Sequence, residues 1–185
     1  MDQPTDIPSP ERLHELLDTI GRFKSPDWQT HLAAMAEIER AGQHALPVIK
    51  QRLADANARV RRFCAGFFDH FAENECEAGI LRALGDGNAD VRRIALHSLS
   101  CQRCKPHPLT FDITALLLDR ALADPSLRVR RVALSYLHGR SPDPRIVAGM
   151  ERILAEATDR CLRRRAQGVL DDQCQRTGHD GTPDG

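Results

Sequence analysis

The segment Asp86-Gly-Asn-Ala-Asp-Val91-Arg92-Arg93-Ile-Ala-Leu, residues 86–96, decides the fold because its pattern recurs along the chain. Two further copies align with it without gaps, DANARVRRFCA from residue 55 and DPSLRVRRVAL from residue 124. A fourth copy, ATDRCLRRRAQ from residue 157, lacks the leading aspartate. Repetition of one pattern predicts a fold built by stacking copies of one structural unit.

The spacing of the copies indicates that each unit contains two helices. The aligned apolar residues Val60, Val91, Val129 and Leu162 lie 31, 38 and 33 residues apart. An amphipathic segment precedes each copy, and two helices with two turns need about 30–40 residues. Of all residues, 41% are hydrophobic but only 4% are aromatic, which leaves Leu, Ile, Val and Ala to build closely packed helices. The sequence therefore predicts an all-α fold.

These blocks resemble those of bacterial HEAT-like repeat proteins of the PBS-lyase type, across residues 43–172. The resemblance implies a right-handed α-solenoid of four to five helix pairs. We expect a repeat domain over residues 9–175, between disordered tails at 1–8 and 176–185. Its repeats are expected at 26–55, 57–86, 88–124 and 126–157, followed by a final helix at 159–174.

Each position of the block has an expected role. On a helix that turns 100° per residue, Val60 and Cys64 share a buried stripe, so Cys64 is interpreted as a small core residue. The resemblance implies that the first arginine pairs with the acidic residue of an inter-repeat turn. The arginines are Arg61, Arg92, Arg130 and Arg163, and the acidic residues are Asp55, Asp86 and Asp124. Ala157 has no carboxylate, so we expect the last turn to be looser.

The second arginine of each pair points outward in this pattern. Aligned across the copies, Arg62, Arg93, Arg131 and Arg164 predict a basic stripe on the outer face. One interpretation is a surface for phosphates or for an acidic protein. The other is an ordinary solvated helix face, because a run of charges needs suitable geometry to become a site.

The other helix of each repeat is implied by the resemblance to line a concave surface, through which solenoids mostly bind their partners. Its basic residues are Arg52, Arg82, Arg120 and Arg152. The leading hypothesis is a monomeric, non-catalytic scaffold that binds a protein partner there. The alternative is nucleic-acid binding, or a function related to HEAT-like DNA glycosylases, because residues 50–170 hold 21 of the 26 Lys and Arg residues and 14 of the 26 Asp and Glu residues.

The long interval after Val91 contains residues with metal-ligand chemistry. His97, Cys101, Cys104 and His107 supply two imidazoles and two thiols, a set that suits tetrahedral zinc. The competing interpretation is a long loop with ordinary thiols, since four ligands within so few residues are cramped and Pro106 and Pro108 restrict the backbone. A redox Cys-x-x-Cys site is disfavoured, because that motif normally follows a strand.

No catalytic constellation stands out in the sequence. We find no Ser-His-Asp order, Gly-rich phosphate loop or paired-carboxylate motif. A glycosylase needs aromatic residues to stack an extruded base, and Trp28 is the single tryptophan. A di-iron hydroxylase needs repeated His-Glu pairs, and His14-Glu15 is the one pair present. The formal net charge is zero, and no apolar run is long enough to cross a membrane, so we expect a cytoplasmic protein with reduced cysteines.

Overall fold

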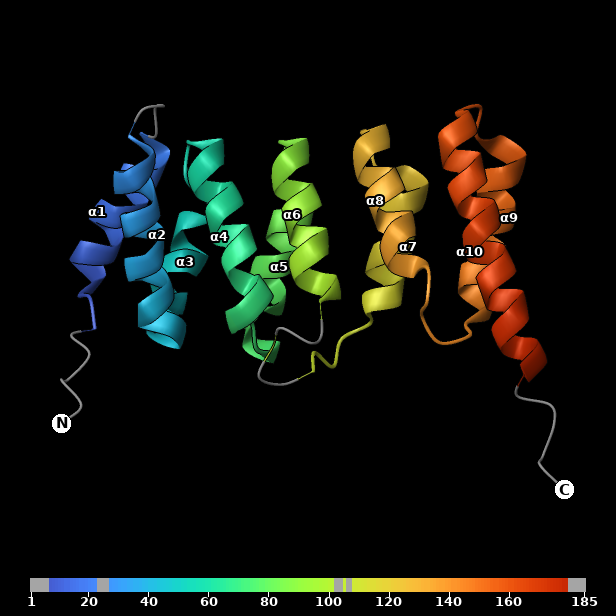
Figure 1. Cartoon of the computed structure of the whole chain (residues 1–185), viewed down its shortest axis with the longest axis horizontal. Helices are drawn as coiled ribbons and strands as arrows, with labels where there is room; N and C mark the ends of the chain where they lie inside the picture. Colours follow the sequence, from blue (N-terminus) through green and yellow to red (C-terminus); the bar gives the residue numbers. More distant parts are fainter. Residues whose placement is uncertain (1–6, 23–26, 102–104, 106–107, 180–185) are drawn as a thin grey trace, which may run out of the picture. The chain divides into compact units, whose positions relative to one another are not determined.

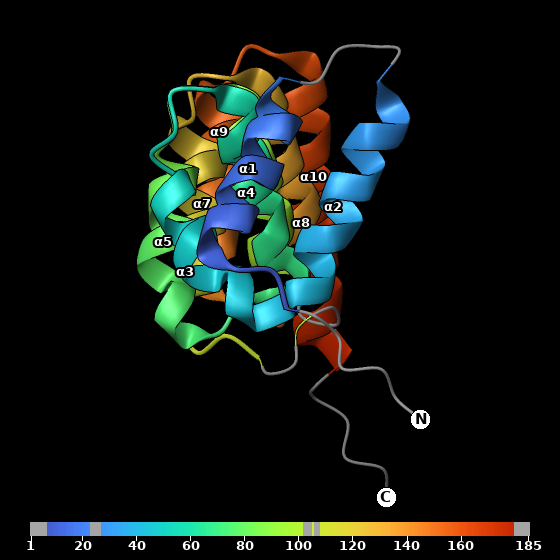
Figure 2. The same cartoon turned by 90° about the vertical axis from the view of Figure 1, so that its left-hand side faces the viewer.

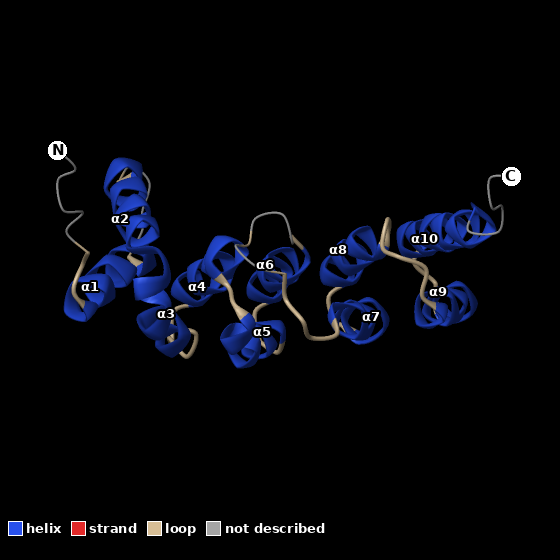
Figure 3. Cartoon of the chain, turned by 90° about the horizontal axis from the view of Figure 1, so that it is seen from below, coloured by secondary structure: helices blue, strands red, loops and turns tan. Residues whose placement is uncertain are grey.

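The computed structural model describes residues 7–22, 27–101, 105 and 108–179, and within these ranges every regular element is helical (Figures 1 and 3). The prediction of an all-α fold is therefore confirmed for this part of the chain. The chain divides into two compact units, unit 1 over Met1–Thr110 and unit 2 over Phe111–Gly185. None of the described helices is both long enough and apolar enough to span a membrane.

Unit 1 is centred on α4, which packs against α1, α3, α5 and α6. Its elements are α1 (Pro10–Gly21), α2 (Trp28–Ala41), η1 (Gly42–Ala45), α3 (Leu46–Arg52), α4 (Ala58–Phe71), η2 (Asn74–Cys76), α5 (Glu77–Leu84) and α6 (Ala89–Ser100). Helices α3 and α5 lie in one row, and α4 and α6 lie in a second row (Figure 3). Helix α2 packs against α1 and η1 at the start of the unit.

Unit 2 also has two rows of helices. Its elements are α7 (Ile113–Ala123), α8 (Leu127–Leu137), α9 (Pro144–Glu156) and α10 (Arg160–His179). Helix α8 packs on α7 and α10, and α9 packs on α7 and α10. Within unit 1 the repeated block forms α4 and α6, which share a row, and within unit 2 it forms α8 and α10, which also share a row.

The apolar positions of the repeated block form the core, as predicted. Val60, Val91, Val129 and Leu162 are all buried. The small residue four positions later, Cys64, Ala95, Ala133 or Ala166, is buried in every copy as well. The interpretation of Cys64 as a small core residue is therefore confirmed.

Local side chains explain where several helices begin. The Ser9 hydroxyl accepts a hydrogen bond from the Arg12 amide at 3.2 Å, and the Asn57 side chain accepts one from the Arg59 amide at 3.0 Å. These contacts satisfy N–H groups that a helix leaves unpaired at its start. At the other end of the chain, α10 continues to His179, beyond the end expected at residue 174.

Arg61, the first arginine of its block, contacts both its own block and the next one. Its guanidinium pairs with the Asp86 carboxylate at 2.7 Å and also donates to the Asp55 carbonyl oxygen at 2.8 Å. Arg92 repeats the second contact, donating to the Asp86 carbonyl oxygen at 2.7 Å. These arginines therefore hold the turn that precedes their own helix, and Arg61 also reaches the following turn.

The last block has its carboxylate at another position. Asp159 aligns with the capping residues Asn57 and Asn88, and it accepts the Leu162 amide at 2.6 Å at the start of α10. It pairs with Arg131 at 2.7 Å, so Arg131, expected on a solvent-facing stripe, has an ion pair instead. The first arginine, Arg130, donates to the Ala121 carbonyl oxygen at 2.8 Å, and a looser last turn stays a prediction.

Candidate functional site

Helix α2 carries two apolar stripes but buries only one of them. Ala34, Ile38 and Ala41 are its buried residues. The second stripe contains Trp28, Leu32 and Met35, spaced four and three residues apart, as on one face of a helix. Trp28 is 55% exposed and Leu32 is 51% exposed. In Figure 2, α2 lies at the edge of the unit, beside α1.

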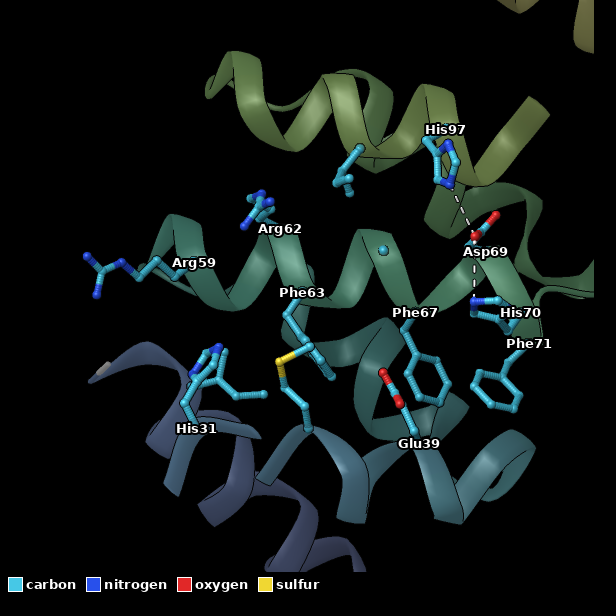
Figure 4. A pocket seen from close by; sticks show the side chains of 14 residues that line it. His31, Glu39, Arg59, Arg62, Phe63, Phe67, Asp69, His70, Phe71 and His97 are labelled. Carbon is cyan, nitrogen blue, oxygen red and sulfur yellow. Dashed lines mark ion pairs between the residues drawn. The ribbon is translucent and has the colours of Figure 1, made fainter. Parts of the chain in front are cut away.

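A hollow of about 500 Å³ lies between α2 and α4, and we call it the α2–α4 groove (Figure 4). Helix α2 contributes His31, Met35 and Glu39. The other lining residues are Ile20 from α1, Ile94 and His97 from α6, and Arg59, Arg62, Phe63, Gly66, Phe67, Asp69, His70 and Phe71 from α4. A volume of this size is in the range of sites that bind small molecules or side chains of a partner.

Three phenylalanines of α4 make the apolar wall of the groove. Phe63, Phe67 and Phe71 are four residues apart, so they follow one another along the helix. The rings of Phe67 and Phe71 stack with centroids 4.5 Å apart, and those of Phe63 and Phe67 lie 6.4 Å apart. Gly66 also lines the groove, and a Cβ atom there would lie 3.8 Å from Ile94 Cγ2 of α6.

One end of the groove is basic. Arg59 and His31 lie there, and Arg62 follows on the next turn of α4 (Figure 4). Partial burial lowers the pKa of His31, and the positive charge of Arg59 lowers it further. Both effects disfavour protonated His31. Arg62 is exposed and has no ion pair within the described residues, so it is available to an anionic group.

The opposite end of the groove carries acidic groups. Glu39 is exposed, whereas Asp69 is only 8% exposed. The Oδ2 atom of Asp69 lies 3.2 Å from His97 Nε2 and 3.7 Å from His70 Nε2. Its other oxygen, Oδ1, is buried and has no hydrogen-bond partner among the described residues. A buried carboxylate oxygen without a donor is costly, so this end of the groove favours a hydrogen-bond donor.

The chemistry of the lining suits binding better than covalent catalysis. Among the described residues that line the groove there is no Ser, Thr, Cys or Lys. A hydroxyl, thiol or amine nucleophile is therefore not at hand next to His70 or His97. What the groove does offer is an apolar wall with a basic end and an acidic end.

The structure places the residues predicted for a concave binding surface outside this groove. Most of them are already paired: Arg52 with Asp18 and Asp55, Arg120 with Asp119 and Asp124, and Arg152 with Glu156. Arg52 is also largely buried, with 15% of its side chain exposed. Arg82 is exposed and has no ion pair within the described ranges.

The four residues of the predicted outer stripe have different environments. Arg62 lines the groove, and Arg164 is exposed on α10. Arg93 lies 3.4 Å from Asp90 on its own helix, and Arg131 pairs with Asp159. Only Arg62 of this set therefore belongs to the candidate site.

The predicted zinc ligands are placed only in part. His97 pairs with Asp69, and Cys101 is half-buried at the end of α6. Cys104 and His107 lie outside the described residues. Within the part of the chain that is described, no group of three or more His, Cys, Asp or Glu side chains is arranged to hold a metal ion. Zinc binding at this loop stays a prediction.

Lys105, after α6, is a buried residue that sequence analysis did not single out. Its ammonium donates to the carbonyl oxygen of Cys101 at 2.7 Å and to that of Ser98. A cation at this end of a helix satisfies carbonyl groups that have no partner within the helix. Lys105 is therefore held at the end of α6 by these hydrogen bonds.

The groove itself was not predicted from the sequence. Its signals were present, because Trp28, Leu32 and Met35 have helical spacing, and so do Phe63 and Phe67. Helical spacing alone does not distinguish a stripe buried in the core from one that faces a groove. The hollow between α2 and α4 makes the difference, and it depends on tertiary packing, since α1 packs against both helices.

The chain was compared with protein families, with curated proteins and with solved structures. No family model matches the chain, and no curated protein matches it. Among solved structures, the chain is similar to a crystal structure of an engineered protein, a target of the Northeast Structural Genomics Consortium. The two share 13% identity with a TM-score of 0.47, over 93% of this chain and 87% of the other. A match this loose carries no functional inference.

Proposed function

We propose that this protein is a non-catalytic interaction module, a HEAT-like α-solenoid that binds a partner protein in the α2–α4 groove. The solenoid part of the proposal is supported by the repeated block, which forms helices of one row within each unit. The binding part is carried by one observation, the exposed apolar stripe of α2 beside the aromatic wall of α4.

The extent of the apolar surface favours a protein segment over a small molecule. From Trp28 to Met35 the stripe covers seven positions of α2, a length of about 10 Å at 1.5 Å per residue. A compact ligand that filled the hollow near Met35 would leave Trp28 and Leu32 in water. Covering a large apolar side chain contributes about 1.5–3 kcal/mol. A partner long enough to cover all three side chains therefore gains the most.

The groove also suits a partner better than the surface of Arg52, Arg120 and Arg152. Those arginines have carboxylate partners of their own, so a ligand would have to compete for them. Arg62 has no such competitor within the described residues. The protein-binding hypothesis is therefore kept, and its location moves to the α2–α4 groove.

Site-specific photo-crosslinking in cells tests this proposal. A photoreactive amino acid is placed at Met35 or Phe63 in the groove, and at Arg82 on α5 as the control. We expect positions 35 and 63 to crosslink to the same segment of one partner protein, identified by mass spectrometry, and position 82 not to do so. The same proteins at all three positions, or nucleic acid at position 35, would contradict the proposal.

A further inference from the structure

The charges of the α2–α4 groove are separated along its length. Arg62 and Asp69 are seven positions apart on α4, which corresponds to about 10 Å or two helical turns. Arg59 extends the basic end, and Glu39 from α2 joins Asp69 at the acidic end (Figure 4). Phe63 and Phe67 lie between the two ends, and Phe71 lies beside His70 at the acidic end.

From this arrangement we infer that the occupant, if the proposed function holds, is an amphipathic helix of a partner protein with a particular charge order. It carries an acidic residue for Arg62 and, about two turns away, a basic residue for Glu39 and Asp69. Apolar residues at intermediate helical positions lie against Met35 and the aromatic wall. A helix fits because positions i, i+3, i+4 and i+7 fall on one face, which matches the two-turn separation of the charges.

The acidic end gives the stronger reason for a cation. Asp69 is buried, and its Oδ1 atom has no hydrogen-bond partner within the described residues. Glu39 has no ion pair there either. A lysine or arginine of the partner supplies donors, and its apolar stem lies along the stacked rings of Phe67 and Phe71, whose faces attract a cation.

The basic end sets the other requirement. Arg62 is exposed and has no ion pair within the described residues, and Arg59 lines the same end of the groove. A carboxylate of the partner is expected to pair with Arg62. Because the two ends differ in sign, a segment with one kind of charge meets repulsion at one of them. The groove therefore selects a segment with both.

Synthetic helical peptides of about 16 residues test the charge order directly. A bipolar peptide has a glutamate and a lysine seven positions apart, flanking leucines. The comparison peptides replace both charges by glutamine, or the glutamate by lysine. The peptides lack tryptophan, so the fluorescence of Trp28, the single tryptophan of the full chain, reports binding. We expect the bipolar peptide to bind about fivefold more tightly than the glutamine peptide at low salt.

A charge exchange completes the test. Arg62→Glu should lower the affinity for the bipolar peptide about tenfold and raise the affinity for the peptide that carries two lysines. Arg82→Glu should change neither affinity. Equal affinities for all peptides, or an unchanged bipolar affinity in Arg62→Glu, would overturn the inference about charge order. Neither of these two results affects the crosslinking of a partner at position 35. The proposed function is therefore tested independently of the charge order.

Discussion

Single residues join one repeat to the next, and the Arg61–Asp86 pair is the clearest case. The Asp86 side chain is 9% exposed and also accepts the Asn88 amide at 2.7 Å. Burial alone raises the pKa of Asp86, but the hydrogen bonds from Arg61 and Asn88, with the nearby positive charges, outweigh it and the net pKa is lowered. The ionised form is therefore stabilised by folding.

Asp86→Asn should lower the free energy of unfolding by about 2 kcal/mol at pH 7, since a buried charged hydrogen bond is lost and Arg61 loses its carboxylate. Urea unfolding followed by Trp28 fluorescence measures this. Because the folded pKa of Asp86 lies below the unfolded value, the contribution is complete above about pH 4 and is lost as the pH falls through the folded value. The difference between the two proteins should therefore shrink in acid. A difference that is independent of pH would argue against the pair.

Cys64 illustrates how burial controls reactivity. Burial raises the pKa of the Cys64 thiol to about 12, and the thiolate is the reactive form. We expect an alkylating reagent at pH 8 to modify the exposed Cys174 and leave Cys64 untouched until urea unfolds the chain. Peptide mapping by mass spectrometry gives the two rates. Similar rates at both cysteines in the native protein would show that Cys64 is accessible.

Two helices of unit 1 approach each other closely at a glycine, which has no side chain to keep them apart. A Cβ atom at Gly79 of α5 would lie 2.9 Å from Phe68 Cζ of α4 and 3.3 Å from Leu53 Cδ1. Phe68 is buried, so its ring has little room to move. At Gly168 of α10 a Cβ would meet nothing within 4 Å.

Gly79→Ala should destabilise unit 1 by about 1 kcal/mol, because overpacking costs more than the gain in helix propensity. Gly168→Ala is the control and should stabilise the chain by up to about 1 kcal/mol, because it gains propensity without a clash. Thermal unfolding followed by circular dichroism compares them with the original chain. Stabilisation by Gly79→Ala would show that α4 and α5 are not packed as described.

Helices were the most predictable elements, and their contacts the least. The repeated block predicted the buried Val60 and the cap at Asn57, because both depend on local spacing. The sequence could not reveal that Arg131 pairs with Asp159, since this contact joins α8 to the start of α10. For the same reason, the sequence could not reveal that the second apolar stripe of α2 is exposed.

For the molecule as a whole, sequence repetition predicted the all-α class but not the site. The basic residues that it suggested, such as Arg52, are held in ion pairs. The α2–α4 groove brings together residues as distant along the chain as His31 and His97. Such a site depends on how helices meet, and a single sequence carries little information about that.

A substitution in the groove should separate binding from stability. Met35→Glu puts a charge beside the aromatic wall, so burying the site under a partner then requires removing that charge from water. We expect partner or bipolar-peptide affinity to fall at least tenfold, with unfolding changed little because Met35 is only half-buried. Leu81→Glu, at an exposed leucine of α5, is the matched control and should bind normally. Equal losses in both variants would point to a general effect of added charge.

The most direct test of the account is to locate the binding site of the partner segment on the full chain. Changes of amide chemical shifts in nuclear magnetic resonance spectra give this location. The uniformly labelled protein is titrated with the partner segment identified by crosslinking at position 35. The account predicts that the largest shift changes fall in α2 and α4, over residues 28–41 and 59–71, with smaller changes near His97. Changes confined to α3, α5 or unit 2 would contradict the proposal that the α2–α4 groove is the binding site.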